Sequence, residues 1–245
     1  MKNSIKICIT AFFVLALISS CKNAAKDEKI INNLPDNPEE MKGIRYVAIG
    51  DSYTIGEGID RNKAWPVILA GKLNENGIGI KLLANPSRTG WTTQDAIKNE
   101  MPVFRKSKPD FATLMIGVND WVQGADRESF RQSFISLIGQ MQDLLSDRSK
   151  IIVVTIPDFS ATPTGRIYGS GRDISKGISE FNEIIKQESK KRNIEVVDIY
   201  PVTQEMAKNR ELVAGDGLHP SEKEHKIWSE MIYPVAYKLL KDYRN

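Results

Sequence analysis

Residues 44–58 read I-R-Y-V-A-I-G-D-S-Y-T-I-G-E-G. The apolar run 44–49 is of strand type, and it ends at Gly50. Three glycines within residues 50–58 allow backbone angles that other residues resist, and a helical pattern resumes near Ala64. Ser52 is therefore expected in the strand-to-helix turn of an α/β unit, which is where open parallel sheets bind ligands. Taken alone, Gly-Asp-Ser is more typical of an ordinary loop in which Asp51 or Ser52 caps a turn.

Four further strand-like runs continue the alternation that begins at residue 44. They are rich in branched apolar residues, and each is short enough for a buried strand. These runs lie at 80–84, 111–116, 151–156 and 194–199. The sequence thus predicts an α/β fold with a parallel sheet whose two faces are covered by helices.

Helical patterns occupy the segments between the predicted strands. The clearest follows Asp126, and its apolar residues recur at a spacing of 3.6. These residues are Phe130, Phe134, Leu137, Ile138, Met141, Leu144 and Leu145. Other helices are expected at about 64–76, 93–105, 173–192 and 221–243, the last with a bend at Pro234.

The amino-terminal segment has the form of an export signal. Lys2 and Lys6 precede the apolar run 7–18, which is too short to cross a bilayer. The tetrapeptide ending at Cys21 resembles the bacterial lipobox, in which the cysteine is lipidated and becomes the new N-terminus. A cleaved signal with a chance cysteine at its boundary is the alternative. We expect a lipoprotein signal peptide over 1–20 and lipidation of Cys21.

The remaining composition supports one catalytic-sized domain on a tether. Cys8 lies inside the signal, so Cys21 would be the only cysteine after processing and no internal disulfide is expected. The segment 21–42 is polar and is expected to be a flexible tether. Of the 245 residues, 41% are hydrophobic and 27% charged, which suits one α/β domain over 43–245.

Charge and targeting features narrow the partners and the location. The formal net charge of +3 falls to +1 once the segment with Lys2 and Lys6 is removed, so no nucleic-acid partner is expected. We expect a monomer whose membrane partner is reached through the N-terminal lipid. Lysine, rather than the aspartate that retains some lipoproteins at the inner membrane, follows Cys21. This resemblance favours the outer membrane, with the protein facing the periplasm or the cell surface.

Polar loops follow the predicted strands at the edge where ligands bind. They span 85–92, 117–121 and 216–220. A hydrolytic serine needs a base, and the sequence has two histidines. His225 lies in a helical pattern and is more typical of a packed or solvated residue. His219 lies in a turn with Asp216 three residues before it, so a carboxylate could hold its Nδ1 and leave Nε2 for a nucleophile.

Four short blocks in this order carry a family resemblance. They are Gly50-Asp51-Ser52, Gly90, Gly117-Val118-Asn119-Asp120 and Asp216-Gly217-Leu218-His219-Pro220. The sequence resembles the SGNH branch of the GDSL hydrolases over nearly the whole segment after residue 43. The resemblance implies a three-layer α/β/α sandwich with a flavodoxin-like five-stranded parallel sheet. It also implies hydrolysis of carboxylic esters, including short acyl, carbohydrate or lysolipid esters.

The resemblance also assigns roles residue by residue. It implies that Ser52 is the nucleophile, His219 the base and Asp216 the residue that orients the base. The oxyanion donors are then Ser52, Gly90 and Asn119.

Two departures from the family pattern bear on the substrate pocket. Tyr53 replaces the usual leucine, and Arg88-Thr89 precede Gly90 where small residues are frequent. A substrate pocket is expected from Asp51, Tyr53, Trp91 and Trp121, together with the loop 157–172. Each aromatic residue is equally consistent with core packing.

Other functions remain open from the sequence. An α/β-hydrolase of the usual type is disfavoured because no serine lies in G-x-S-x-G. A metal-dependent phosphoesterase would have to recruit Asp51, Asp120, Asp216 and His219, yet no H-x-H or H-E-x-x-H cluster is present, so no metal or other cofactor is expected. A non-catalytic surface lipoprotein that binds a glycan or a partner is the alternative from another class. An acyltransferase would use the same residues as the esterase.

Overall fold

The computed structural model describes residues 42–243 and contains one five-stranded, all-parallel sheet. The predicted signal segment, Cys21 and the tether up to residue 41 lie outside the described residues. The strand order is β2-β1-β3-β4-β5, the order of flavodoxin-like sheets. The strands are β1 (Ile44–Gly50), β2 (Ile80–Ala84), β3 (Phe111–Met115), β4 (Ile151–Val154) and β5 (Glu195–Val197). The predicted fold class is confirmed.

Burial explains why the strands read as apolar runs. Every residue of the central strands β3 and β4 is buried, and only Arg45 of β1 is not. A strand covered on both faces has no solvent side, so the usual alternation of polar and apolar residues disappears. The edge strand β5 is exposed at Glu195. One polar pair lies inside the sheet, where the Tyr46 hydroxyl and Thr113 Oγ1 are 2.7 Å apart.

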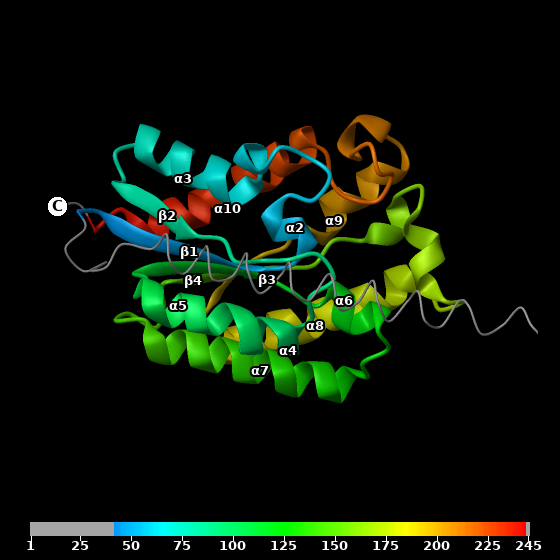
Figure 1. The fold of residues 1–245 in the computed structure, drawn as a ribbon, viewed down its shortest axis with the longest axis horizontal. Coiled ribbons are helices and arrows are strands. Elements are labelled where there is room, and N and C mark those ends of the chain that lie inside the picture. Colours follow the sequence, from blue (N-terminus) through cyan, green and yellow to red (C-terminus); the bar gives the residue numbers. More distant parts are fainter. Residues whose placement is uncertain (1–41, 244–245) are drawn as a thin grey trace, which may run out of the picture.

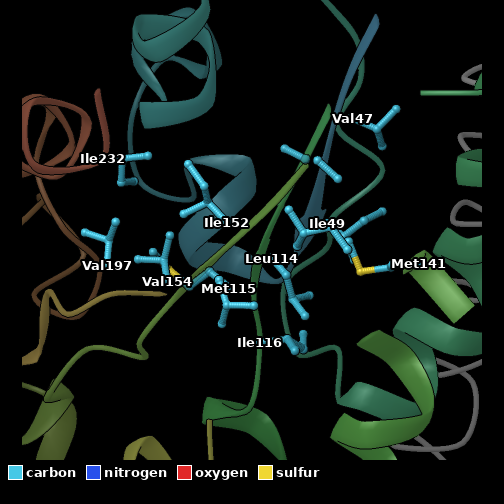
Figure 2. Close-up of a cluster of buried hydrophobic side chains, with 14 of the residues drawn as sticks. Val47, Ile49, Leu114, Met115, Ile116, Met141, Ile152, Val154, Val197 and Ile232 are labelled. Carbon is cyan, nitrogen blue, oxygen red and sulfur yellow. The ribbon is translucent and has the colours of Figure 1, made fainter. Parts of the chain in front are cut away.

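Helices form a layer on each face of the sheet (Figure 1). Helices α3 (Trp65–Glu75) and α10 (Glu222–Leu240) pack together on one face. Helices α5 (Met101–Ser107), α7 (Arg127–Leu144) and α8 (Ile174–Lys191) cover the other. Figure 2 shows how strand side chains fill the space between the layers, with Met141 of α7 and Ile232 of α10 at its two sides.

Helix ends largely follow the sequence signals. The Asp126 carboxylate accepts from the backbone N–H groups of Glu128 and Ser129, which caps α7 as predicted. Helix α10 continues through Pro234 to Leu240, and the predicted bend there stays a prediction. Within residues 42–243, no helix has the length and apolar character that a membrane span requires.

The predicted helix over 93–105 is divided into three parts. It consists of α4 (Thr93–Asp95), the π-helical segment η3 (Ala96–Glu100) and α5. Pro102 at the start of α5 has no N–H for the carbonyl four residues earlier, and its ring would clash with that carbonyl. A π-helical turn before the proline avoids this conflict.

Short helices lie at the carboxyl end of the sheet, where Figure 1 shows α2, α6 and α9. The α-helical ones are α2 (Ser52–Ile55), α6 (Val118–Val122) and α9 (Tyr200–Thr203). The 3-10 segments are η2 (Arg61–Lys63), η4 (Phe159–Ala161), η5 (Gly165–Gly169), η6 (Gln204–Ala207) and η7 (Arg210–Leu212).

Candidate active site

Ser52 is the first residue of α2, directly after β1. The Asp51 carboxylate caps this helix because its Oδ1 accepts from the Tyr53 N–H at 3.0 Å. A Cβ at Gly50 would stand 2.5 Å from the Met115 carbonyl oxygen, so only glycine allows the strand to end this close to β3. The turn therefore places the serine at the carboxyl edge of the sheet.

The loop after β2 lies against residues 50–58, the serine turn. Asp51 and Arg88 form an isolated parallel bridge, and Thr89 Oγ1 donates to Glu57 Oε2 at 2.7 Å. Gly90 follows with a left-handed backbone (φ +84°). No described heavy atom lies within 4 Å of the place where a Gly90 Cβ would stand. The Gly90 backbone therefore borders open space beside the serine turn.

Asn119 of α6 joins these two segments. Its Nδ2 donates to the Trp91 carbonyl oxygen at 2.9 Å and to Asp51 Oδ2 at 3.3 Å. Gln123, one turn further along, donates from Nε2 to the Gly90 carbonyl oxygen at 3.3 Å. The second Asn119 contact is long for a hydrogen bond, so that N–H can turn to a new acceptor at little cost.

His219 and Asp216 form a close pair. His219 Nδ1 lies 2.6 Å from Asp216 Oδ2, and Asp216 Oδ1 accepts from the backbone N–H groups of Leu218 (2.8 Å) and His219 (2.9 Å). The turn is closed by the Ala214 N–H, which donates to the His219 carbonyl oxygen at 2.8 Å. Both carboxylate oxygens are therefore committed, and the carboxylate holds the imidazole by Nδ1.

The His219 ring lies beside the serine turn. Its centroid is 5.3 Å from that of Tyr53, the residue after Ser52. Gly58, at the end of the same turn, faces Asp216, since a Cβ there would stand 3.0 Å from Asp216 Oδ2. Sequence reasoning missed this role of Gly58, for which the only signal was the density of glycines after Ser52.

Burial and hydrogen bonding give the carboxylates in this region different pKa values. Burial raises the pKa of Asp51 to about 8, and the nearby Asp120 adds to the effect. Burial also raises the pKa of Asp120, whose Oδ2 accepts from the Thr93 N–H. Burial acts in the same direction on Asp216, but hydrogen bonds from the His219 ring and two backbone N–H groups outweigh it and lower its pKa. Asp216 is thus the carboxylate held ionised beside the imidazole.

His225 has a different environment. It is fully buried in α10, and its Nδ1 accepts from the Trp65 N–H at 3.2 Å. Burial, with a smaller contribution from His219, lowers its pKa to about 3. A neutral imidazole that accepts a backbone hydrogen bond is a packing residue.

Three of the four residues expected to line a substrate pocket are buried. Asp51 and Tyr53 flank Ser52 at the start of α2, and Trp121 packs against Gly177, where a Cβ would overlap its indole ring. Trp91 is half-buried, with the Arg88 guanidinium 5.4 Å from its ring centroid. Of the four, Trp91 has the most surface to offer a substrate.

An open groove of about 730 Å³ adjoins the outer side of the His219 loop. It lies between the segment 58–60 and residues of 211–223. Ser52 and His219 are not among its lining residues. Within residues 42–243, no three histidine, cysteine, aspartate or glutamate side chains are grouped as a metal site.

Known proteins with similar sequences are hydrolases. Residues 48–227 match the profile of the GDSL-like Lipase/Acylhydrolase family. The chain is 25% identical over 225 residues to an acetylxylan esterase from Xylanibacter ruminicola, covering 82% of this chain but only 44% of that longer protein. It is 22% identical over 198 residues to an arylesterase from Vibrio mimicus, covering 80% and 88% of the two chains.

A solved structure shares the fold. The lipase/acylhydrolase from Enterococcus faecalis superimposes with a TM-score of 0.67 at 21% identity, covering 80% of this chain and 97% of that chain.

Proposed function

The chain belongs to the GDSL-like Lipase/Acylhydrolase family, and from this premise we propose that it is a serine esterase in which Ser52 is the nucleophile. The observation that carries the proposal is the 2.6 Å contact of Asp216 with His219, whose ring lies beside that of Tyr53, the residue after Ser52. A serine hydrolase needs an imidazole that is oriented in this way.

In the proposed reaction, Ser52 Oγ attacks the carbonyl carbon of the ester while His219 Nε2 takes its proton. Asp216 accepts the Nδ1–H bond and stabilises the imidazolium. His219 then protonates the departing alcohol, which leaves an acyl group on Ser52. Water attacks this acyl-enzyme with His219 again as base, and the carboxylic acid is released.

Negative charge on the carbonyl oxygen would be stabilised by three donors. They are the backbone N–H groups of Ser52 and Gly90 and the Nδ2 of Asn119. The open space beside Gly90 and the long Asn119 contact to Asp51 support this assignment. Removing one such donor costs on the order of 100- to 1000-fold in turnover.

The substrate is proposed to be a carboxylic ester of a small acyl group, a carbohydrate or a lysolipid. The relatives named as acetylxylan esterase and arylesterase support an ester, and they differ in the alcohol part. Transfer of the acyl group to a sugar hydroxyl instead of water would use the same residues. Product analysis with and without an acceptor alcohol separates the two activities.

We also propose that the chain is an exported lipoprotein held on a bacterial membrane, with the outer membrane favoured. The support is the Lys2 and Lys6 pair, the apolar run 7–18 and Cys21. These residues lie outside the part of the chain that the structure describes.

The experiment that tests the esterase is active-site labelling of the full chain. A fluorophosphonate probe should label Ser52 alone, as read by intact mass and peptide mapping. Ser52→Ala should abolish both labelling and hydrolysis of p-nitrophenyl acetate, and the matched control Ser87→Ala, a buried serine of the neighbouring loop, should keep both. A folded chain that neither labels nor turns over would favour the non-catalytic binding protein.

A further inference from the structure

A short strap, residues 164–172, connects the two sides of the candidate site. At one end, Thr164 N and Oγ1 both donate to the Gly217 carbonyl oxygen, at 3.0 and 2.9 Å, within the turn that carries His219. At the other end, the Arg172 guanidinium donates to the Trp121 carbonyl oxygen at 2.7 Å, in the helix that carries Asn119. The strap is thus bonded to the elements that hold the proposed base and the proposed oxyanion donor.

The strap packs inward on glycines. Gly165 and Gly169 are its buried residues. A Cβ at Gly165 would overlap the Phe159 carbonyl oxygen, and one at Gly169 would stand 3.1 Å from the Ile174 side chain. This close packing fixes the backbone of the strap and leaves its larger side chains on the outside.

Two adjacent outward side chains, next to the exposed Arg166, are apolar. Ile167 is 73% exposed and Tyr168 is 41% exposed. Over residues 42–243, the only other exposed large hydrophobic residues are Val67 and Tyr243, which are distant from the strap in sequence. Two adjacent apolar side chains on a fixed surface segment indicate a binding role, because folding gains nothing from exposing them.

Ile167 and Tyr168 lie midway along the strap. The strap's bonds to the Gly217 and Trp121 carbonyl oxygens lie on either side of them along the chain. The apolar pair therefore lies between the turn that carries His219 and the helix that carries Asn119.

We propose that Ile167 and Tyr168 bind the apolar acyl chain of the ester substrate beyond its first two carbons. This inference rests on the proposed esterase function. The more exposed residue of the pair is aliphatic, which suits an alkyl chain. A sugar ring would need hydrogen-bond partners, and the Ile167 side chain supplies none. The pair thus makes the chain prefer medium-length acyl esters over acetyl esters.

The test compares kcat/KM of the full chain for p-nitrophenyl acetate, butyrate and octanoate, below the micelle-forming concentration. The variant with both Ile167→Ser and Tyr168→Ser should lose about 10-fold on octanoate and less than about 2-fold on acetate, as expected for removal of apolar contact area. Val67→Ser, at an exposed apolar position on α3, is the matched control and should change neither.

An unchanged ratio of octanoate to acetate overturns the proposal. So does an equal loss on both esters, since the strap would then act only through the His219 turn. If the ratio stays constant while binding to phosphatidylcholine vesicles falls, the pair contacts a lipid surface and the acyl-chain role is wrong.

A second measurement does not depend on turnover. In a Ser52→Ala background, calorimetry should show about 10-fold weaker binding of p-nitrophenyl octanoate when Ile167 and Tyr168 are replaced by serine. If the unaltered chain lacks turnover but this difference in binding remains, the esterase proposal fails and the acyl-chain site stands. Equal binding overturns the site.

Discussion

Gly58 packs against the carboxylate that orients His219, so Gly58→Ala should lower activity without any direct change to the proposed catalytic residues. A Cβ at position 58 would stand 3.0 Å from Asp216 Oδ2 and 3.0 Å from Ala214 Cβ. Asp216 Oδ2 is the atom that lies 2.6 Å from His219 Nδ1. The new methyl group therefore presses on the hydrogen bond that holds the imidazole.

The size of the effect follows from these distances. Ordinary contact begins at 3.4 Å, so the carboxylate must move by about 0.4 Å. A misplacement of about 1 Å can cost 100-fold in rate, so we expect kcat/KM to fall roughly 10-fold. The left-handed backbone at Gly58 (φ +84°) adds strain of about 1–2 kcal/mol for alanine.

Gly77→Ala is the matched control. Gly77 has nearly the same backbone angle (φ +81°), but no described heavy atom lies within 4 Å of its missing Cβ. Backbone strain should lower the Tm of both variants by about 2–8 °C, measured by circular dichroism, and the contacts with Asp216 and Ala214 should add to the loss in Gly58→Ala. Only Gly58→Ala should lose activity on p-nitrophenyl acetate. Equal kcat/KM in the two variants would refute the view that the Asp216 position controls the rate.

Four other substitutions test the base, the buried acid and the anchor. His219→Ala should abolish turnover and probe labelling. His225→Ala should keep the kcat of the folded chain and lower the free energy of unfolding by about 1–3 kcal/mol, because the Trp65 N–H loses its acceptor; lost turnover there would mean that the wrong histidine was chosen. With its pKa raised to about 8, folded Asp51 keeps a proton that the unfolded chain releases above about pH 4, so stability should fall as pH rises from 4 to 8. Asp51→Asn should flatten that slope in urea midpoints, and an unchanged slope would place the effect elsewhere. Cys21→Ser should release the protein from bacterial membranes, and association that survives the change would rule out the lipid anchor.

The sequence predicted the sheet because burial leaves a direct mark on composition. The central strands β3 and β4 are covered on both faces, so each of their residues had to be compatible with the core. The alternation of such runs with helical patterns then fixed the parallel topology class. The π-helical segment η3 could not be read in this way, because its hydrogen-bond shift follows from backbone geometry around Pro102.

The sequence also predicted the residues of the candidate site, through four short blocks in a fixed order. It did not indicate which residues near that site are exposed to solvent. Asp51, Tyr53 and Trp121 were expected near substrate, and the structure buries all three, as it does Ser52 and His219, so their contact with substrate stays a prediction. Aromatic and acidic residues serve in pockets and in cores alike, so composition does not separate the two roles.

By itself, the sequence determined the fold class, the likeness to the family and the segments that supply Ser52, Asn119 and His219. Those features depend on local pattern and on order along the chain. Only the tertiary structure decided that Gly58 meets Asp216 and that the strap 164–172 joins the two sides of the site. These contacts link residues about 50 to 160 positions apart, and no local pattern records a distance that arises when separate loops meet at one edge of a sheet.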